Sequence, residues 1–486
     1  IEEGLNPDKK DYYAEWCLQK QRGDELVEFW KEHVINGQGE SSFHFLIILN
    51  PGEEELLADT IDSLAGQIYQ KWYLTVVSVM KCPDSTFEEL DYLEWLELKE
   101  TGNPYEAINE SIIGSNCEWF CLLEPGVVFE RYCLAMIDGY IKLHEEWVFI
   151  YTDEDQFDIK GKRVNPLFKP DFNLDLLLST PYLGCFCFIK SKILLSTGGF
   201  SGLLGAENYD FSLKVLGVVG ESAFGHISDI LVHRPCDAVR VFDTEMGLQA
   251  LSQYFKRDGA EVVVSHSEIK GSYHINYKVN ASKKVTIIIA TKDQILLLKA
   301  CLNSIFETTR YPNYEVLIVD NQSEKTETKQ YLAELVQSNK GRVKVIDYNK
   351  PFNYSAINNL AVEQATGDYL VLLHNDTMVL QEEWLQGMLS QVQRHEVGVV
   401  GVKLIYPDKT LQHAGLMLGV GKEGVASYAF NSLPMMNKGY MDRAMLVHEY
   451  SAVSGACLMI EKKYIHFMHR QKNILNMMEL YSKHTE

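Results

Sequence analysis

The sequence predicts an α/β protein built from two related domains, each with a mostly parallel central sheet flanked by helices. Three observations lead to this prediction. The chain has 486 residues, enough for two domains, and 46% of them are hydrophobic, enough for real cores. Apolar runs of strand length alternate with segments in which Leu and Ile recur at helical spacing. The same order of strand, helix and strand occurs twice, at a separation of roughly 250 residues.

The expected elements divide the chain into five parts. Residues 1–42 are predicted to be a helical lead-in, and residues 43–237 the first domain. Residues 238–281 are predicted to be a connector with one helix and a short strand. Residues 282–464 are predicted to be the second domain. Residues 465–486 form an atypical tail, rich in Met, Lys and His and poor in apolar periodicity.

The repeat is clearest in the opening segment of each domain. The stretch from Phe43 to Val79 mirrors the stretch from Val285 to Asn321, and each reads as a buried strand, a turn, a helix and a second apolar strand. The apolar strands are nearly unbroken, which is typical of parallel sheets with helices on both faces.

Composition excludes several classes of function. A formal charge of −22 argues against nucleic acid as a partner and against broad docking on anionic lipid. The apolar runs are too short to span a membrane, and no signal-peptide pattern opens the chain. The ten cysteines show no C-x-x-C pair and no zinc-like spacing, so a reducing, cytoplasmic compartment is expected.

Polar side chains follow three strand-like runs of the second half, at the point where each run ends. Parallel strands end at one edge of a sheet, and ligands bind beyond the carboxyl ends of such strands, so these side chains are expected to share a site. The alternative is that each one caps a helix or shapes a turn. The residues are Thr291, Lys292 and Asp293, then Asp320 and Asn321, then His374, Asn375 and Asp376.

The acids at these strand ends suit a nucleoside diphosphate. Asp320 can accept hydrogen bonds from a base or a ribose hydroxyl. Asp376 can ligate a divalent metal, Mn²⁺ or Mg²⁺, that bridges two phosphates, with Asn375 or water completing the shell. Such a cation neutralises a diphosphate leaving group. The sequence contains neither a P-loop nor a strand-linked G-x-G-x-x-G, so those cofactor sites are disfavoured.

Six segments of the second half form a recurring set of motifs: VTIIIATKD, CLNSIFETTRYPNYEVLIVDNQS, FNYSAINNLAV, GDYLVLLHNDT, GVVGVKLIYPDKTLQHAG and SAVSGACLMI. In these motifs, the second half resembles the family-2 inverting glycosyltransferases of the GT-A fold. The first half resembles the family in FIYTDEDQFDIKGKRVNPLFKPDFNLDLLLSTPYLG and GHISDILVHRP. Together they resemble tandem-domain enzymes that build bacterial surface polysaccharides such as O-antigen, capsule or rhamnan.

The resemblance implies a role for each matching residue of the second half. Base and ribose would be held by Thr291, Asp293, Asp320 and Asn321. Asn358 would face the nucleotide and its phosphates. The family's D-x-D metal motif corresponds to His374-Asn375-Asp376, so Asp376 would be the main metal ligand and His374 a second candidate. His413 would lie in a loop near the donor sugar, with a purely structural histidine as the alternative.

The first half departs from the family at the residues that carry chemistry. Ser78 stands where the second half has Asp320, and Gly126 where it has Asp376, which leaves Glu124 as the remaining acid. Asn208 aligns with the catalytic base, and an amide cannot take a proton; Glu207 and Asp210 are nearby acids. The first domain is therefore expected to be catalytically degenerate.

Two further segments carry expectations. The acidic run YTDED, Tyr151 to Asp155, is expected to be exposed, either as a solvated loop or as an acceptor-binding segment. In the second half, the family's acidic pair with the base would fall in residues 465–486, where no such pair occurs. No base can be named, and Asp442, Glu449 or a residue of the first domain are the alternatives. The chain is expected to bind donor and to transfer sugar slowly or not at all.

Three functions remain open. The first is a glycosyltransferase that uses a UDP- or dTDP-linked sugar and a glycan or lipid-linked glycan acceptor, located in the cytoplasm or at the inner face of the membrane. The second is a pseudoenzyme that binds nucleotide-sugar or glycan without turnover. The third is a scaffold that organises membrane-bound polysaccharide enzymes. A phosphoryl-transfer enzyme fits less well, because its phosphate loop is missing.

Overall fold

The computed structural model describes residues 12–20, 23–34, 40–83, 87, 90–236, 241–339, 341–420 and 425–465. The chain divides into two compact units. Unit 1 comprises Ile1–Ala260, Val264–Ile275 and Leu446–Glu449, and unit 2 comprises Glu261–Val263, Asn276–Met445 and Tyr450–Glu486. The expected lead-in and the connector helix fall within unit 1 by this division. Within the described ranges, no helix is long and apolar enough to cross a membrane.

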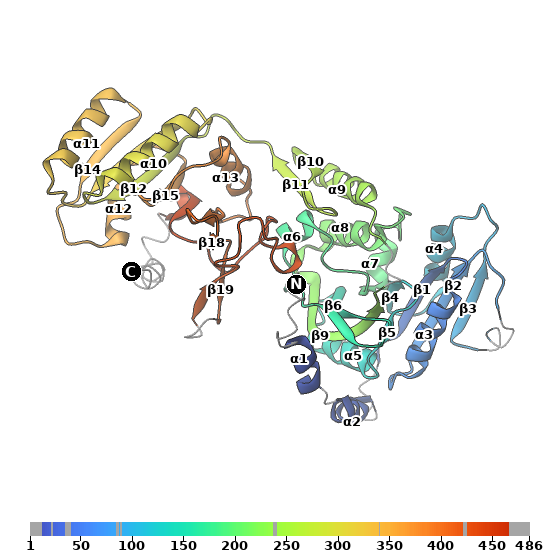
Figure 1. Cartoon of the computed structure of the whole chain (residues 1–486). Helices are drawn as coiled ribbons and strands as arrows, with labels where there is room; N and C mark the ends of the chain where they lie inside the picture. The colour runs from blue at the N-terminus through green and yellow to red at the C-terminus, as the bar shows by residue number, and fades with distance from the viewer. Residues whose placement is uncertain are drawn as a thin grey trace. The chain divides into compact units, whose positions relative to one another are not determined.

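The sheet of unit 1 has the strand order β3-β2-β1-β4-β8-β6-β9-β5, with β7 paired to β6 (Figure 1). Neighbours among β1 to β4 run parallel, whereas β8 lies antiparallel to β4 and to β6. The bounds are β1 Phe43–Leu49, β2 Trp72–Ser78, β3 Leu93–Glu97, β4 Trp119–Leu123, β5 Val128–Phe129, β6 Phe149–Phe157, β7 Arg163–Leu167, β8 Cys187–Lys190 and β9 Phe224–Pro235.

Helices cover both faces of the sheet of unit 1. α3 (Glu54–Ala65) and α5 (Cys133–Leu143) lie on one face, and α4 (Pro104–Gly114) and α7 (Ser191–Ser196) on the other (Figure 1). Alternate residues of β1 point to the first of these faces, where Phe43, Phe45 and Ile47 join a buried apolar core with side chains of α3 and α5. This period of two is what a strand with two covered faces requires.

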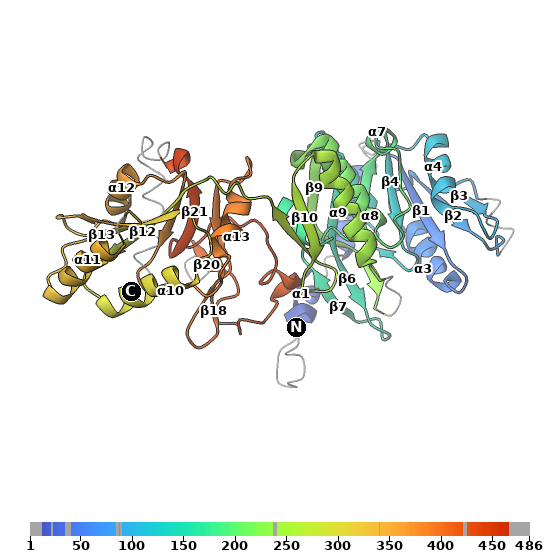
Figure 2. The same cartoon turned by 90° about the horizontal axis from the view of Figure 1, so that it is seen from above.

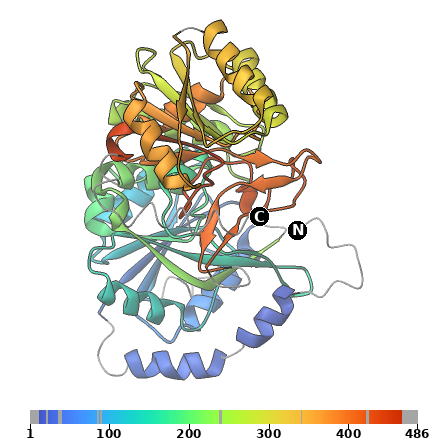
Figure 3. The same cartoon turned by 90° about the vertical axis from the view of Figure 1, so that its left-hand side faces the viewer.

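Further helices complete unit 1. The lead-in forms α1 (Tyr12–Lys20) and α2 (Gly23–His33), drawn in dark blue in Figure 3; α1 packs on β7 and α2 on α5. α6 spans Leu174–Ser179 and α8 spans Glu207–Val219. The predicted connector helix is α9 (Thr244–Asp258), and it packs on α8. The ladder of β10 (Val262–His266) with β11 (Tyr273–Tyr277) follows it.

The sheet of unit 2 has the strand order β14-β13-β12-β15-β21-β16. β12 runs parallel to β13 and β15, and β13 runs parallel to β14, whereas β21 is antiparallel to β15 and β16. Its first four strands repeat the order β3-β2-β1-β4 of unit 1. The bounds are β12 Val285–Thr291, β13 Tyr314–Asp320, β14 Val343–Asp347, β15 Tyr369–Leu373, β16 Val399–Gly401 and β21 Cys457–Glu461.

Two cores lie on the two faces of the sheet of unit 2. Ile287 and Ile289 of β12 face a core built with α10, α11 and α13, whereas Ile288 faces a second core built with α12. Figure 2 shows α12 on one side of β12 and β13, and α10 and α11 on the other. The prediction of an α/β fold with helices on both faces of each sheet is thus confirmed. The helices are α10 Ile295–Thr308, α11 Thr326–Ser338, α12 Tyr354–Gln364 and α13 Trp384–Val392.

Short ladders in unit 2 carry the segment between β16 and β21. β17 (Leu404–Ile405) pairs with β18 (Leu411–His413), and β19 (Leu416–Leu418) pairs with β20 (Ala426–Tyr428). A 3-10 turn, η4, spans Tyr440–Asp442. These ladders hold the His413 loop against the residues that precede β21.

Candidate functional site

The polar residues of the second half meet at one edge of the unit 2 sheet, as predicted. β12 ends at Thr291, and its register with β13 sets Thr291 directly beside Asp320. On the other side of β12, β15 ends at Leu373, immediately before His374-Asn375-Asp376. The three strands are parallel neighbours, so their carboxyl ends form a single ledge.

Thr291 connects the two sides of this ledge. The side-chain amide of Asn375 donates to the hydroxyl of Thr291 at 3.2 Å. The backbone N–H of Asn321 donates to the carbonyl of Thr291 at 2.8 Å. The side chain of Asn321 donates to the carbonyls of Tyr348 at 3.2 Å and Lys350 at 2.9 Å. Thr291 and Asn321 are buried, and both therefore shape the ledge through hydrogen bonds within the protein.

A second set of contacts joins the end of β13 to the turn after β12. Asp320 accepts from the backbone N–H of Ser323 at 3.1 Å, and the Ser323 hydroxyl accepts from the backbone N–H of Asp293 at 2.7 Å. The Asp293 carboxylate accepts from the N–H groups of Lys325 at 3.0 Å and Glu324 at 3.3 Å, and these bonds lower its pKa. Asp320 is thus oriented, and Asp293 is tied to the start of α11.

The two candidate metal ligands lie at the exposed end of β15. The side chains of His374 and Asp376 both reach the surface. The backbone N–H of His374 donates to the carbonyl of Ala456 at 3.0 Å, which fixes this turn to the start of β21. Partial burial of the imidazole ring lowers the pKa of His374, and the negative charge of Asp376 opposes this shift. A neutral imidazole is the form that can ligate a metal.

Asn358 is connected to this ledge through Tyr354. It is buried on α12, and its amide donates to the carbonyl of Tyr354 at 2.8 Å. The Tyr354 ring meets the His374 ring edge-on at 5.9 Å between centroids, and its hydroxyl lies 3.4 Å from the carbonyl of Gly455. The described contacts therefore link Asn358 to the candidate metal ligands through Tyr354.

His413 is almost fully buried, with 2% of its surface exposed. Its Nε2 accepts a hydrogen bond from the backbone N–H of Ser454 at 3.1 Å, so Nδ1 carries the proton when the ring is neutral. Burial lowers its pKa to about 4, which keeps the ring neutral near pH 7. Its contact with Ser454 places it beside the loop that leads into β21.

The ledge fits a cation that brings part of its own coordination shell. In the part of the chain that the structure describes, no three His, Cys, Asp or Glu side chains gather to hold a metal between them. A magnesium ion in phosphate chemistry is commonly held by one or two carboxylates, with phosphate oxygens and water as the other ligands. Asp376, with His374 beside it, is a donor set of this limited kind.

Sequence reasoning missed three residues that organise the ledge. Ser323 bridges Asp320 and the turn at Asp293, Tyr354 bridges α12 and His374, and Ser454 fixes His413. Each of the three lies inside a motif that the sequence did highlight: Ser323 in DNQS, Tyr354 in FNYSAIN and Ser454 in SAVSGA. Their roles depend on backbone hydrogen bonds across separate loops, which residue spacing does not encode.

The equivalent edge of unit 1 is closed by structural contacts. The hydroxyl of Ser78 donates to the carbonyl of Leu49 at 2.9 Å. Gly126 has φ +91°, and a Cβ there would lie 3.1 Å from the Leu56 side chain and 3.2 Å from Pro235, so no larger side chain fits unstrained. The remaining acid, Glu124, lies 3.5 Å from the guanidinium of Arg234.

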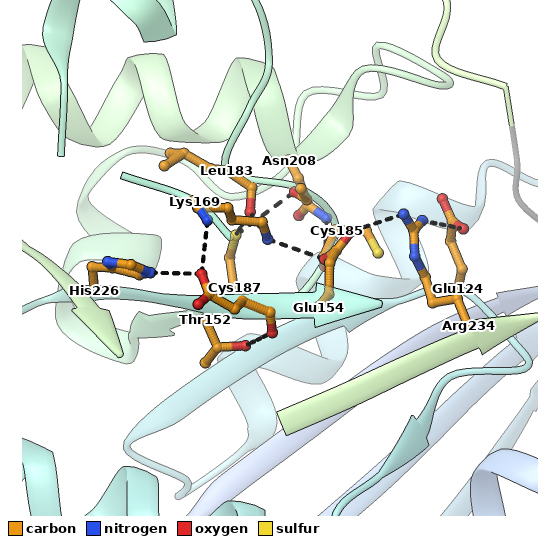
Figure 4. A network of polar contacts seen from close by, with 12 residues as sticks. Glu124, Thr152, Glu154, Lys169, Leu183, Cys185, Cys187, Asn208, His226 and Arg234 are labelled. Atoms are coloured by element: carbon orange, nitrogen blue, oxygen red, sulfur yellow. Dashed lines mark hydrogen bonds and ion pairs between the residues drawn. The ribbon is translucent and has the colours of Figure 1, made fainter. Parts of the chain in front are cut away.

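The acidic run YTDED was expected to be exposed, and this prediction is wrong. Tyr151 to Asp155 form the middle of β6, and the exposed fractions of Asp153, Glu154 and Asp155 are 3%, 1% and 0%. Buried carboxylates are stable only when they are paired. Glu154 lies 3.1 Å from Lys169 and 2.8 Å from Arg234, and these two cations outweigh the effect of burial and lower its pKa (Figure 4).

The neighbouring acids of β6 are paired as well. Asp153 contacts Nε2 of His226 at 3.0 Å. Asp155 contacts Nδ1 of His233 at 2.5 Å and Nε of Arg163 at 2.5 Å. It also accepts a hydrogen bond from the hydroxyl of Tyr13 on α1. The acidic run is therefore part of a buried ion network that spans β6, β7 and β9.

Asn208, at the base-like position of unit 1, faces the same network. Its amide donates to the carbonyls of Cys185 at 3.0 Å and Leu122 at 3.4 Å (Figure 4). The two neighbouring acids are engaged elsewhere: Glu207 accepts from the hydroxyl of Tyr105, and Asp210 contacts Lys214 at 3.1 Å.

The segment expected to contain the base of the second half lies almost wholly outside the described residues, which end at Ile465. Of the two alternatives, Glu449 belongs to unit 1, whereas Asp442 lies in η4 of unit 2 with φ +58°. No base is assigned to unit 2.

Comparisons with known proteins point to one family. Residues 286–466 match the family model of Glycosyl transferase family 2. The chain is 32% identical over 444 residues to the O-antigen biosynthesis protein RfbC of Myxococcus xanthus, covering 88% of this chain and 34% of that protein. It is 31% identical over 433 residues to the uncharacterized protein y4gI of Sinorhizobium fredii, covering 86% of this chain and 47% of that protein. The chain thus spans a third to a half of the length of these relatives.

Among solved structures, S. aureus TarS 1–349 in complex with UDP-GlcNAc shows 14% identity. The match covers 44% of this chain and 66% of that chain, with a TM-score of 0.36. A match this weak supports no statement about a ligand of this chain. The sequence relatives, by contrast, cover both units.

Proposed function

Because the chain belongs to glycosyl transferase family 2 through residues 286–466, we propose that unit 2 transfers a sugar from a nucleotide-diphosphate donor to a polysaccharide or lipid-linked glycan. A UDP- or dTDP-linked sugar is the proposed donor. Kinship with a protein named for O-antigen biosynthesis supports a surface polysaccharide as the product. The proposal includes a cytoplasmic location, peripheral at the inner face of the membrane, beside the polysaccharide machinery.

The observation that carries this proposal is the placement of Asp320 and Asp376 on either side of β12. Asp320 ends β13, and Asp376 follows β15, on the other side of β12. We propose that the two carboxylates serve different parts of one elongated ligand. Asp320 is oriented by Ser323 and can accept from a ribose hydroxyl or a base. Asp376 reaches the surface, where a phosphate-bound cation is accessible to it.

The residues of unit 2 divide the remaining work. Thr291, Asn321 and Asn375 form the floor of the ledge through their mutual hydrogen bonds. A divalent metal, Mn²⁺ or Mg²⁺, held by Asp376 with His374 as second candidate, would neutralise the charge that develops on the diphosphate. Inversion at the anomeric carbon requires a base that takes the proton of the acceptor hydroxyl. That base is left unassigned.

A second candidate function is binding without turnover, and one observation favours it for unit 1. The amide of Asn208 is engaged with backbone carbonyls at the position where a base would act. Ser78 and Gly126 also remove the two acids that unit 2 has. Unit 1 is accordingly proposed to bind acceptor or to support unit 2, in either case without chemistry.

Calorimetric titration of the full chain with a panel of uridine and thymidine diphosphates tests the donor site. Each titration is run with Mn²⁺ and again with chelator. Binding that requires the metal is the expected result. A chain that binds none of these nucleotides in either condition contradicts the proposal and leaves a scaffold as the surviving function.

A further inference from the structure

The turn after β15 in unit 2 carries two side chains that can ligate a metal. Within the ranges that the structure describes, no hydrogen bond or ion pair engages the imidazole nitrogens of His374 or the carboxylate of Asp376. The backbone N–H of Thr377 donates to the carbonyl of His374 at 3.2 Å and closes the turn. Asn375, between the two, donates to Thr291. The described hydrogen bonds therefore hold the turn but not its two possible ligands.

A structural histidine of unit 1, His44, shows the opposite arrangement. Its Nδ1 contacts the hydroxyl of Ser115 at 3.0 Å, and its Nε2 contacts the hydroxyl of Thr75 at 2.8 Å. A metal-binding histidine, by contrast, keeps one nitrogen for the metal and is usually oriented by an acceptor for the N–H of the other. No described residue supplies such an acceptor to His374. The orientation of its imidazole therefore depends on packing.

Tyr354 supplies this packing. Its ring meets the imidazole of His374 edge-on, with 5.9 Å between the centroids and an angle of 79° between the planes. Tyr354 opens α12, where its carbonyl accepts from the amide of Asn358 at 2.8 Å, and its hydroxyl donates to the carbonyl of Gly455 at 3.4 Å. The next carbonyl, that of Ala456, accepts from the backbone N–H of His374 at 3.0 Å. One loop thus fixes both the backbone of His374 and the tyrosine that packs on its ring.

A nitrogen ligand changes which cations suit this turn. Mg²⁺ takes oxygen ligands in a nearly ideal octahedron. Imidazole favours first-row transition ions, and the affinity of a given site rises from Mn²⁺ to Co²⁺. In the D-x-D motif that residues 374–376 resemble, both ends are oxygen ligands, whereas the first end in this chain is His374. A turn that offers one carboxylate and one imidazole therefore suits Mn²⁺ or Co²⁺ better than Mg²⁺.

We propose that Tyr354 is a positioning residue that holds the imidazole of His374 as a metal ligand, and that this nitrogen makes the site of unit 2 select Mn²⁺ over Mg²⁺. The inference rests on the proposed function, because the metal acts there together with a nucleoside diphosphate. It adds a choice between two metals that the proposed function leaves open, and it names the residue that maintains this choice.

Three variants separate the ligand from the residue that positions it. His374→Asp replaces the nitrogen by oxygen and should bring Mg²⁺ level with Mn²⁺. Tyr354→Leu keeps the imidazole but removes the ring that orients it, whereas Tyr354→Phe keeps the ring and loses only the hydroxyl contact with Gly455. The matched control is Tyr428→Leu, which removes an edge-on contact of the same kind, 5.4 Å from the ring of His413.

Titration calorimetry of the full-length proteins with UDP, in Mn²⁺ and again in Mg²⁺, gives the ratio of the two affinities. We expect this ratio to fall roughly tenfold in Tyr354→Leu, the lower end of what the loss of an outer contact costs a metal site. It should stay near the wild-type value in Tyr354→Phe and in Tyr428→Leu. Urea unfolding of each variant shows whether the fold is retained.

Pulsed electron paramagnetic resonance of Mn²⁺ in the complex with UDP gives a second readout, because a coordinated imidazole couples its nitrogen nucleus to the metal. The coupling should be present in the wild type, absent in His374→Asp and weaker in Tyr354→Leu. A loss of stability alone produces no such pattern.

The possible failures are distinguishable. A wild type that binds UDP equally well with Mn²⁺ and Mg²⁺, without nitrogen coupling, overturns the inference and leaves the proposed function intact. Wild-type ratio and coupling in Tyr354→Leu would also overturn it, because Tyr354 would then position nothing. A wild type that binds UDP with neither metal contradicts the proposed function and this inference together.

Discussion

The side-chain amide of Asn375 donates to the hydroxyl of Thr291 at 3.2 Å, and this bond joins the ends of β15 and β12. It fixes the middle residue of His374-Asn375-Asp376, with a candidate metal ligand on either side. Because Thr291 also lies beside Asp320, one threonine connects the proposed metal-binding and nucleoside-binding halves of the ledge.

Replacing Thr291 by Val should weaken nucleotide binding in the presence of Mn²⁺. The valine keeps the shape but cannot accept from Asn375, and a lost hydrogen bond is worth about 1 kcal/mol, or roughly fivefold in affinity. Titration calorimetry with UDP measures the change. The control is Thr309→Val, which removes a hydroxyl that accepts from Trp384 Nε1 at 2.9 Å, away from the strand ends. Equal affinities for the two variants would count against the ledge.

Crystals soaked with a nucleotide-sugar and Mn²⁺ should show density at the ledge of unit 2 and none beside Glu124. In unit 1, Ser78 is engaged with Leu49, Gly126 is closed in by Leu56 and Pro235, and Glu124 is paired with Arg234. Nucleotide density next to Glu124 would show that unit 1 kept a donor site by other means.

Lys169→Met should destabilise unit 1 strongly. Lys169 and Glu154 are both almost fully buried, and removing one partner of a buried pair typically costs about 3–5 kcal/mol. Urea unfolding of the full chain measures the loss. The control is Lys31→Met, which breaks the exposed pair of Lys31 with Glu28 and should cost less than about 1 kcal/mol. Similar costs for the two variants would mean that the network contributes little.

His413→Gln should reduce the acid sensitivity of the fold. Burial lowers the pKa of His413 from 6.5 to about 4. Between these two pH values the imidazole is protonated in the unfolded chain but stays neutral in the folded chain. The stabilisation is complete above pH 6.5 and is lost as the pH falls toward 4. Between pH 7 and 5 the wild type should lose about 2 kcal/mol more than the variant.

The readout for this prediction is urea unfolding of wild type and His413→Gln at pH 7 and pH 5. Glutamine reaches the same position with an acceptor for the N–H of Ser454, so the hydrogen bond survives without the titration. Subtracting the change in unfolding free energy of the variant from that of the wild type cancels the contributions of all other titrating groups. An identical pH dependence for both would show that His413 is not held neutral in the folded state.

The fold and the ledge could be predicted from the sequence because both depend on local patterns of residues. Apolar strands of strand length predict the sheet, and a polar residue directly after each strand predicts the edge where Thr291, Asp320 and Asn375 meet. The interpretation of Tyr151 to Asp155 failed for the opposite reason. Three acids in a row look solvated, but Lys169, His226 and Arg234 lie far away in the chain and supply ion-pair or hydrogen-bond partners for them.

A hydrogen bond between residues far apart in the chain illustrates the same limit. Nothing in the sequence near Asn173 indicates that its amide binds the backbone of Glu449, because the two residues are 276 positions apart. Likewise, Asp293 matched a nucleoside-binding position, and the structure adds a second task, since its carboxylate accepts from backbone N–H groups at the start of α11. Its role toward a nucleotide stays a prediction.

The most direct test of the central claim is titration of Asp376→Asn with UDP, with and without Mn²⁺. The wild type should bind only with the metal, and the variant should lose that dependence, with affinity in Mn²⁺ reduced by roughly 1.5–3 kcal/mol. The matched control is Asp347→Asn, an acid at the end of the neighbouring strand β14, which should keep the wild-type metal dependence. A variant at Asp376 that binds UDP as tightly as the wild type, and still only with Mn²⁺, would contradict the assignment of the metal to this ledge.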